Sequence, residues 1–264
     1  MPTALFGLAY PVQALIATLF TWSITALGSC VVFLIRRPER NLMDALLGFA
    51  GGVMIAASFW SLLAPAIEMA DGLGMCAWGT VLAGFLGGGC LLFLGDRAFS
   101  HISHRRAMQA GRKRCAMLIF SITLHNIPEG MAIGVAFGSL AYGLDGSTVA
   151  GAWLLALGIG LQNLPEGMAV SLPLRREGCS RAKSFFFGQL SGIVEPIAAV
   201  LGALLVLKAR TCLPVLLAFA AGAMIYVVVE ELIPESQTNE NKDFMALFTL
   251  VGFSVMMVLD VALG

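Results

Sequence analysis

The chain has 264 residues, of which 58% are apolar and only 12% are charged, and its formal net charge is zero. Because a soluble domain carries about 25% charged residues, this composition excludes an ordinary soluble domain and predicts an integral membrane protein. No basic domain suited to binding nucleic acid is present in the sequence.

A helix needs about 20 predominantly apolar residues to cross the bilayer core. Applied along the chain, this length predicts eight membrane spans, with no cleavable signal before the first. In chain order they are residues 8–35, 42–66, 73–95, 115–138, 149–173, 184–207, 212–233 and 244–262. We therefore expect an all-α integral membrane fold, with residues 1–264 forming a single transmembrane domain.

The basic residues predict how these spans are oriented. All 16 Lys and Arg except Lys208 and Arg210 fall on one side of the membrane if the spans alternate. Because Lys and Arg concentrate in cytoplasmic loops, both termini are predicted on the extracytoplasmic side of the cell inner (cytoplasmic) membrane. Residues 96–114 form a basic cytoplasmic loop between the third and fourth spans. His101 and His104 in this loop are interpreted as solvated residues, with metal sensing as the weaker alternative.

The chain also contains an internal repeat. Residues 46–55 and 216–225 match at seven of ten positions. They lie in the second and seventh spans, which cross the membrane in opposite directions. We therefore expect a 3+2+3 arrangement in which spans 1–3 and 6–8 are inverted repeats around spans 4 and 5. Inverted repeats around a mid-membrane site are typical of transporters.

Two near-copies of one polar motif lie on the two central spans. Residues 124–132 read LHNIPEGMA and residues 161–169 read LQNLPEGMA. His125 and Glu129 share one helical face, as do Gln162 and Glu166, because each pair is four residues apart. Polar and ionisable groups are costly at this depth and mark a site or a pathway.

Each motif also contains a proline, Pro128 or Pro165, which lacks the N–H that a helix needs. We expect a kink in each helix, so that the loosened turns face each other around a cation. Imidazole nitrogen with carboxylate oxygen suits zinc and other divalent first-row metals, and the set contains no thiolate. The sequence thus predicts a divalent metal site and leaves the preferred metal open among zinc, cadmium, iron and manganese.

Further polar residues extend the candidate site. Glu195 precedes Pro196 in the sixth span and is interpreted as part of the site, because a buried carboxylate is costly there. Met54 in the second span is either a thioether ligand or a packing residue. Asp260 is interpreted as interfacial. A pathway role and a solvated interfacial role both stay open for Asp44, Glu230 and Glu231.

Together the motifs H-N-x-P-E-G and Q-N-x-P-E-G resemble those of the ZIP family of divalent metal transporters, and more narrowly its bacterial GufA-type branch. The resemblance covers essentially the whole chain and implies a binuclear site between spans four and five. The residues that match the first metal position are His125, Glu129, Gln162, Glu166 and Met54. Those that match the second are Asn126, Asn163 and Glu195, with Glu129 and Glu166 bridging. Asp44 and Ser61 match polar residues that flank the pathway.

The resemblance also implies how metal moves. Zinc or another divalent cation would enter the cytoplasm as a transported substrate, with no cofactor, through an elevator-like shift of spans 1, 4, 5 and 6 against spans 2, 3, 7 and 8, in a homodimer. Some relatives have Asp where this chain has Asn163, so the lost negative charge is expected to weaken the second position. Whether two metals bind at once stays open.

Three alternative functions would use the same kinds of metal ligand. A metal-selective channel would give non-saturating flux, and an exporter would differ in the direction of flux. An intramembrane metallo-hydrolase is disfavoured because H-E-x-x-H is absent and both other histidines lie in the predicted loop, so no enzyme activity is expected. Because protons compete with a cation for imidazole and carboxylate ligands, transport is predicted to fall at acidic pH.

Overall fold

The structure is a computed structural model that describes residues 7–34, 40–105, 110–142, 148–176, 178–208, 210–237 and 242–263. Some side chains within these ranges, including that of His125, lie outside the description. Every regular element in the described ranges is helical, which confirms the predicted all-α class. The elements are α1 (Tyr10–Leu34), α2 (Arg40–Ala57), η2 (Ser58–Leu63), α3 (Ala64–Gly72), α4 (Ala77–Arg105), α5 (Ala110–Ser139), η3 (Leu140–Tyr142), α6 (Val149–Arg176), α7 (Arg181–Leu190), η4 (Ser191–Ile193), α8 (Val194–Lys208), η5 (Arg210–Cys212), α9 (Leu213–Val227), η6 (Val228–Leu232), α10 (Ile233–Ser236) and α11 (Lys242–Leu263).

Each predicted span coincides with one helical stretch over most of its length, and six of these stretches are long and apolar enough to cross a membrane. The six are Tyr10–Leu34, Asn41–Gly72, Ala77–Ala98, Arg181–Lys208, Leu213–Ser236 and Asp243–Ala262. The remaining two stretches are α5, with 30 residues, and α6, with 28 residues, which carry the polar motifs. The chain is therefore a multi-pass membrane protein, and crossing by all eight stretches stays a prediction.

The loop predicted at 96–114 is largely helical. α4 continues to Arg105, and α5 begins at Ala110, so only residues 106–109, which lie outside the described residues, separate the two helices. His101 is exposed near the end of α4. The cytoplasmic location of this segment stays a prediction.

Two wide helical turns break the second and seventh stretches. The π-helical segments η2 and η6 interrupt otherwise α-helical stretches, and each is followed closely by a proline, Pro65 or Pro234. Since proline cannot donate the backbone hydrogen bond of a regular turn, a locally wider turn accommodates it. Ser58 and Val228, which begin these segments, are separated by the same interval as the matched decapeptides. The backbone thus repeats a feature that the sequence shares between the two halves.

Helix packing follows the same repeat. The most extensive helix pairs are α1 with α6, α5 with α8, α2 with α11, and α4 with α9. If spans 1–3 are exchanged with spans 6–8 and span 4 with span 5, the α1–α6 pair becomes α8–α5, and the α2–α11 pair becomes α9–α4. The most extensive helix pairs therefore follow the pattern that the predicted repeat would produce, and the inverted 3+2+3 arrangement itself stays a prediction.

Matched glycines make these contacts close. A Cβ added at Gly52 of α2 would meet the backbone of Thr249 in α11, and one added at Gly222 of α9 would meet the backbone of Phe85 in α4. Gly52 and Gly222 occupy the same position in the two decapeptides. Small residues let membrane helices approach at backbone distance, so the repeat fixes equivalent crossings in both halves.

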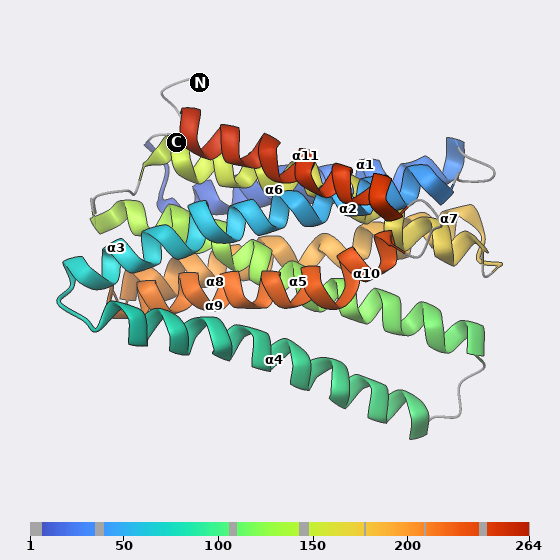
Figure 1. Cartoon of the computed structure of the whole chain (residues 1–264), viewed down its shortest axis with the longest axis horizontal. Coiled ribbons are helices and arrows are strands. Elements are labelled where there is room, and N and C mark those ends of the chain that lie inside the picture. Colours follow the sequence, from blue (N-terminus) through green and yellow to red (C-terminus); the bar gives the residue numbers. More distant parts are fainter. Residues whose placement is uncertain are drawn as a thin grey trace.

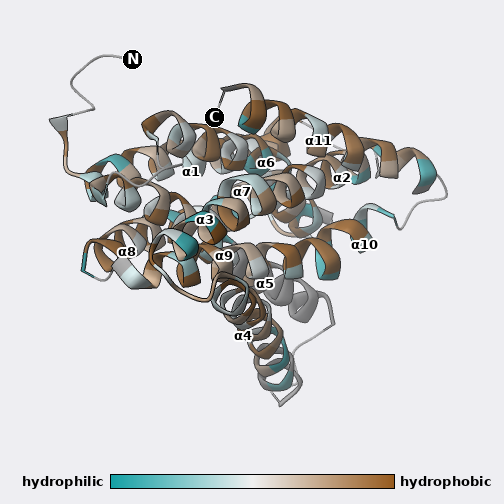
Figure 2. Ribbon diagram, turned by 60° about the vertical axis from the view of Figure 1, so that its left-hand side comes forward, coloured by the Kyte–Doolittle hydropathy of each residue, from teal (hydrophilic) through white to brown (hydrophobic). Residues whose placement is uncertain are grey.

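The outer helices face away from the core. Only 17% of the residues are buried in the most apolar stretches of α4 and α11, against 61% in those of α2–α3 and α9–α10. In Figure 1, α11 and α4 lie at opposite edges of the bundle. Figure 2 shows that both are hydrophobic along most of their length. Apolar surface of this extent is suited to contact with lipid.

Candidate metal site

The two motifs lie at mid-length of α5 and α6, which pack against each other. Both helices continue through their prolines, with Pro128 inside α5 and Pro165 inside α6. The sixth stretch, in contrast, is interrupted, because the short 3-10 segment η4 separates α7 from α8 just before Glu195 and Pro196. Glu195 thus lies in the first turn of α8.

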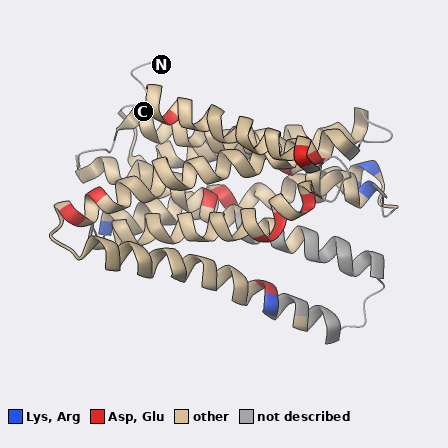
Figure 3. Ribbon diagram, in the orientation of Figure 1, with Lys and Arg blue, Asp and Glu red and all other residues tan. Residues whose placement is uncertain are grey.

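Three carboxylates are buried in the interior of the bundle. Glu129 and Glu195 have no exposed surface, and Glu166 is 4% exposed. Glu129 lies close enough to Glu166 and Glu195 for their charges to interact, and Glu166 likewise interacts with Glu195. Acidic residues halfway along the bundle are visible in Figure 3. Three like charges buried together are costly unless a cation or hydrogen-bond donors compensate them.

Each of these carboxylates has a carboxamide neighbour. Gln162 Nε2 donates to Glu129 Oε1, which joins α6 to α5. Asn163 Nδ2 donates to Glu195 Oε1 at 2.9 Å, which joins α6 to α8. The side chain of Asn126 lies beside Glu166. The site is therefore built from carboxylate–carboxamide pairs that bridge the helices.

The carboxamide oxygens point to the chemistry of the site. Within the described part of the chain, Asn126 Oδ1, Asn163 Oδ1 and Gln162 Oε1 are buried and have no hydrogen-bond partner. About 90% or more of buried polar groups are hydrogen-bonded, so three such oxygens in one place require an explanation. Carboxamide and carboxylate oxygens are suitable ligands for divalent cations.

One residue of the site was not predicted from the sequence. Thr21 of α1 is fully buried, and its Oγ1 donates to Glu195 Oε2. The signal available in the sequence is a set of threonines, Thr18, Thr21 and Thr25, on one face of an otherwise apolar helix. Hydroxyls at this spacing often satisfy only their own backbone, so the pattern alone does not identify Thr21.

The glycines of the motifs bring the helices together. A Cβ at Gly130 would meet the backbone of Glu195, with its Cα at 2.6 Å. A Cβ at Gly167 would meet the backbone carbonyl of Thr25 and the amide nitrogen of Ser29 at 2.9 Å. The residue after each motif glutamate therefore sets the distance from α5 to α8 and from α6 to α1.

The other sequence candidates are not members of these carboxylate–carboxamide pairs. Met54 is buried in the central apolar cluster with Ala132 and Ile133 of α5. Ser61 Oγ donates to Asp260 Oδ1 at 2.8 Å, so these two form a pair of their own between η2 and α11.

The remaining pathway candidates are carboxylates on α2 and η6. Asp44 is buried in α2, Glu230 is exposed, and Glu231 is partly buried. The charges of Glu230 and Glu231 interact with Asp96 of α4, a residue that the sequence analysis did not select. The charge of Glu231 also interacts with that of Glu166 in the candidate site.

The geometry does not yet describe a complete ligand sphere. Among the described side chains, no three His, Cys, Asp or Glu groups lie close enough to hold one cation. The side chain of His125 is not among them, although its backbone lies on the same helical face as Glu129. Recruitment of the carboxamide oxygens, or a change of rotamer, is needed to complete a metal site.

Comparison with known proteins identifies the family. The model of the ZIP zinc transporter family matches residues 8–115 and 103–260, which together span most of the chain. The chain belongs to the ZIP zinc transporter family. The GufA zinc transporter of Myxococcus xanthus is 35% identical, over 95% of this chain and 98% of its own length. Human zinc transporter ZIP11 is 38% identical, over 96% of this chain and 97% of the human protein.

The ZIPB zinc transporter of Bordetella bronchiseptica is 38% identical over 91% of this chain. The predicted resemblance to the ZIP family and its GufA-type branch is thus confirmed. Since the family and these relatives are zinc transporters, the prediction that the chain is not an enzyme is confirmed as well.

Proposed function

We propose that this ZIP family member carries zinc across the cell inner membrane into the cytoplasm, through a site formed by α5, α6 and α8. Eight spans with both termini outside the cytoplasm, and assembly as a homodimer, are part of the same proposal. Membership of a zinc transporter family supports the substrate. Cadmium, iron and manganese are further candidate substrates, since affinity order alone does not set selectivity in proteins.

One observation carries the proposed site. Three buried carboxylates interact within an apolar bundle, and the neighbouring carboxamides present buried oxygens without a protein partner. A divalent cation would compensate the carboxylate charges and be coordinated by the carboxamide oxygens at the same time. No apolar packing role accounts for both features.

The proposed ligands form two positions. The first comprises His125, Glu129, Gln162, Glu166 and Met54. The second comprises Asn126, Asn163 and Glu195, with Glu129 and Glu166 bridging the two positions. Asn163 contributes a neutral carboxamide and no negative charge. The second position is therefore the weaker one, and we propose that it fills only at high cation concentration.

The packing supports a mechanism in which two rigid groups move against each other. One group contains α1, α5, α6, α7 and α8, and the other contains α2, α3, α4, α9, α10 and α11. The four most extensive helix pairs all lie inside a group. Contacts between the groups run mainly through α2 with α6 and α5 with α9, which are themselves related by the repeat.

Close glycine contacts follow the same division into two groups. A Cβ added at any of four glycines would meet the backbone of a helix in the same group; these are Gly130, Gly167, Gly52 and Gly222. Between the groups, a Cβ added at Gly158 of α6 would instead meet the flexible side chain of Met256 in α11. Backbone-on-backbone contacts hold each group rigid, whereas side-chain contacts allow sliding. An elevator-like movement of the first group would carry the cation with α5, α6 and α8.

A flux measurement tests the proposal. Purified protein in proteoliposomes is predicted to take up zinc-65 with saturation, and unlabelled cadmium is predicted to compete. Glu166→Gln keeps the size of the side chain but removes its charge and is expected to lower uptake at least tenfold, the scale of losing a metal ligand or its support. Asp71→Asn, at an exposed carboxylate in α3, is the matched control and should transport normally. Normal uptake by Glu166→Gln would place the pathway elsewhere.

The same assay separates a carrier from a channel. The two rigid groups favour a carrier, whose initial rate saturates as the zinc concentration rises. A rate that increases linearly up to millimolar zinc would support the channel instead.

A further inference from the structure

Thr21 differs from the other buried threonines of α1. Thr18 Oγ1 donates to Ala14 O at 2.8 Å, and Thr25 Oγ1 donates to Thr21 O at 3.4 Å, so both hydroxyls serve their own helix. Thr21 Oγ1 also reaches Thr18 O at 3.1 Å, but in addition it donates to a carboxylate on a different helix, Glu195 Oε2. Of the three, Thr21 alone connects α1 to the proposed metal site.

The same turn of α1 contacts a second residue of the site. Asn163 Nδ2 lies 3.4 Å from the backbone carbonyl of Thr21 and 2.9 Å from Glu195 Oε1. Thr21 thus offers a donor to Glu195 and an acceptor to Asn163, while Glu195 and Asn163 bind each other. The three residues come from α1, α8 and α6, and each contacts the other two.

This arrangement fixes the direction of the Asn163 carboxamide. Its NH₂ group is engaged by two acceptors, Thr21 O and Glu195 Oε1. Its oxygen therefore points away from them, and Asn163 Oδ1 is buried without a hydrogen-bond partner in the described part of the chain. Rotating the carboxamide by half a turn would place Oδ1 against the carboxylate and the carbonyl, which repel it.

We propose that Thr21 is a positioning residue of the metal site, which orients Glu195 and Asn163 so that Asn163 Oδ1 is presented to the cation. This inference rests on the proposed function of the site. Thr21 does not contact the metal. It acts on two residues of the second position, in the way that outer-sphere partners hold ligands in other metal sites.

The structure suggests variants that separate this role from simple packing. Thr21→Val keeps the shape of the side chain and removes the hydroxyl, whereas Thr21→Ser keeps the hydroxyl and removes a methyl group. Thr18→Val is the matched control, because Thr18 is equally buried on the same helix and bonds only its own backbone within the described contacts. A purely structural hydroxyl would give the same result at both positions.

The experiment measures zinc-65 uptake kinetics in proteoliposomes, together with zinc binding by titration calorimetry of the purified protein. Thr21→Val is expected to raise the dissociation constant of the second, weaker zinc position by tenfold or more, within the range of about 10- to 100-fold that loss of an outer-sphere partner costs, while the first position binds zinc as in wild type. Thr21→Ser is expected to stay within about threefold of wild type, and Thr18→Val to be unchanged. If Thr21→Val does not fold, Thr21→Ala is compared with Thr18→Ala in the same way.

Two results would overturn the inference: a wild-type dissociation constant for the second zinc position in Thr21→Val, or a defect in Thr21→Ser as large as in Thr21→Val. Glu166→Gln is measured alongside to separate this from the proposed function. If Glu166→Gln loses transport while Thr21→Val is normal, only the role of Thr21 is wrong. If both variants transport normally, the site itself is wrong.

Discussion

Replacing Gly130 by alanine should disable transport while leaving the chain folded. Gly130 follows the motif glutamate Glu129 and lies where α5 crosses α8. A Cβ at this position would lie 2.6 Å from the Cα of Glu195 and 2.8 Å from its carbonyl carbon. These atoms belong to a backbone and cannot rotate away, so the whole of α8 must move.

The size of that movement follows from van der Waals distances. Non-bonded carbons rest about 3.5–4.0 Å apart, so contact at 2.6 Å requires the helices to separate by roughly 1 Å. Overpacking of this kind costs about 1–3 kcal/mol of stability. A misplacement of 1 Å at a reacting site costs on the order of 100-fold in rate, and here it separates Glu129 from Glu195. Transport is therefore expected to fall far more than stability.

Gly51→Ala supplies the control. Gly51 is also buried in a helix, but its added Cβ would lie 3.7 Å from Leu232 and Val228, an ordinary contact distance. Alanine at this position should be neutral, or stabilising by up to about 1 kcal/mol through helix propensity. Both variants are compared by thermal unfolding in detergent and by zinc-65 uptake at equal protein density. Wild-type uptake by Gly130→Ala, or an equal loss in Gly51→Ala, would refute the reasoning.

Three further predictions follow from the site and the repeat. Asn163→Asp removes the donor that occupies Glu195 and adds a charge, so equilibrium dialysis against zinc should show two cations bound per chain in place of one; an unchanged stoichiometry would contradict this. Because protons compete for imidazole and carboxylate ligands, zinc uptake should decline as the external pH falls from about 7.5 to 5, and a flat profile would count against these ligands. Gly52→Ala and Gly222→Ala, which remove equivalent close crossings, should lower the unfolding temperature by similar amounts, whereas a large difference would argue that the two halves are not structurally equivalent.

Sequence reasoning selected the candidate site because its residues conflict with their surroundings. Glu129, Glu166 and Glu195 stand in apolar segments where carboxylates are costly, and the structure places all three together in the interior. The matched decapeptides likewise predicted a relationship that reappears in the helix pairs and in the crossings at Gly52 and Gly222. Both signals, a repeated segment and a charged residue within an apolar segment, can be recognised in the sequence without knowing which helices contact each other.

Other features depend on contacts that no single segment contains. Thr21 is one of several threonines on α1, and only the position of Glu195 on α8 distinguishes it. Ser61 was predicted to flank the pathway and Asp260 to lie at the interface, but their hydrogen bond appears only when η2 and α11 come together. The π-helical turns were also missed, because a proline predicts a disturbed helix without specifying how the preceding turn adjusts.

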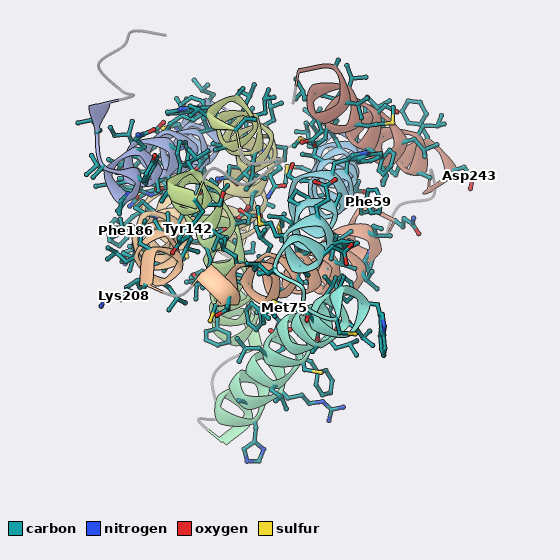
Figure 4. The ribbon with its side chains drawn as sticks, turned by 90° about the vertical axis from the view of Figure 1, so that its left-hand side faces the viewer. Phe59, Met75, Tyr142, Phe186, Lys208 and Asp243 are labelled. Atoms are coloured by element: carbon teal, nitrogen blue, oxygen red, sulfur yellow. The ribbon has the colours of Figure 1, made fainter. Side chains whose placement is uncertain are left out.

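Charged residues near the ends of the helices differ from the buried carboxylates. Lys208 and Asp243 point away from the bundle in a view along its axis (Figure 4). Charged residues near the helix ends predict orientation, whereas those buried within predict chemistry. The sequence therefore predicts orientation and site from different sets of charged residues.

The most direct test of the account is the position of a bound cation. Crystals or frozen particles of the purified protein loaded with cadmium, whose anomalous scattering identifies the ion, should show one strong site between α5 and α6, within coordinating distance of Glu129 and Glu166. A weaker second site beside Asn163 and Glu195 would agree with the account. A dominant site elsewhere, such as beside Asp260 and Ser61 with none between the two motifs, would contradict it.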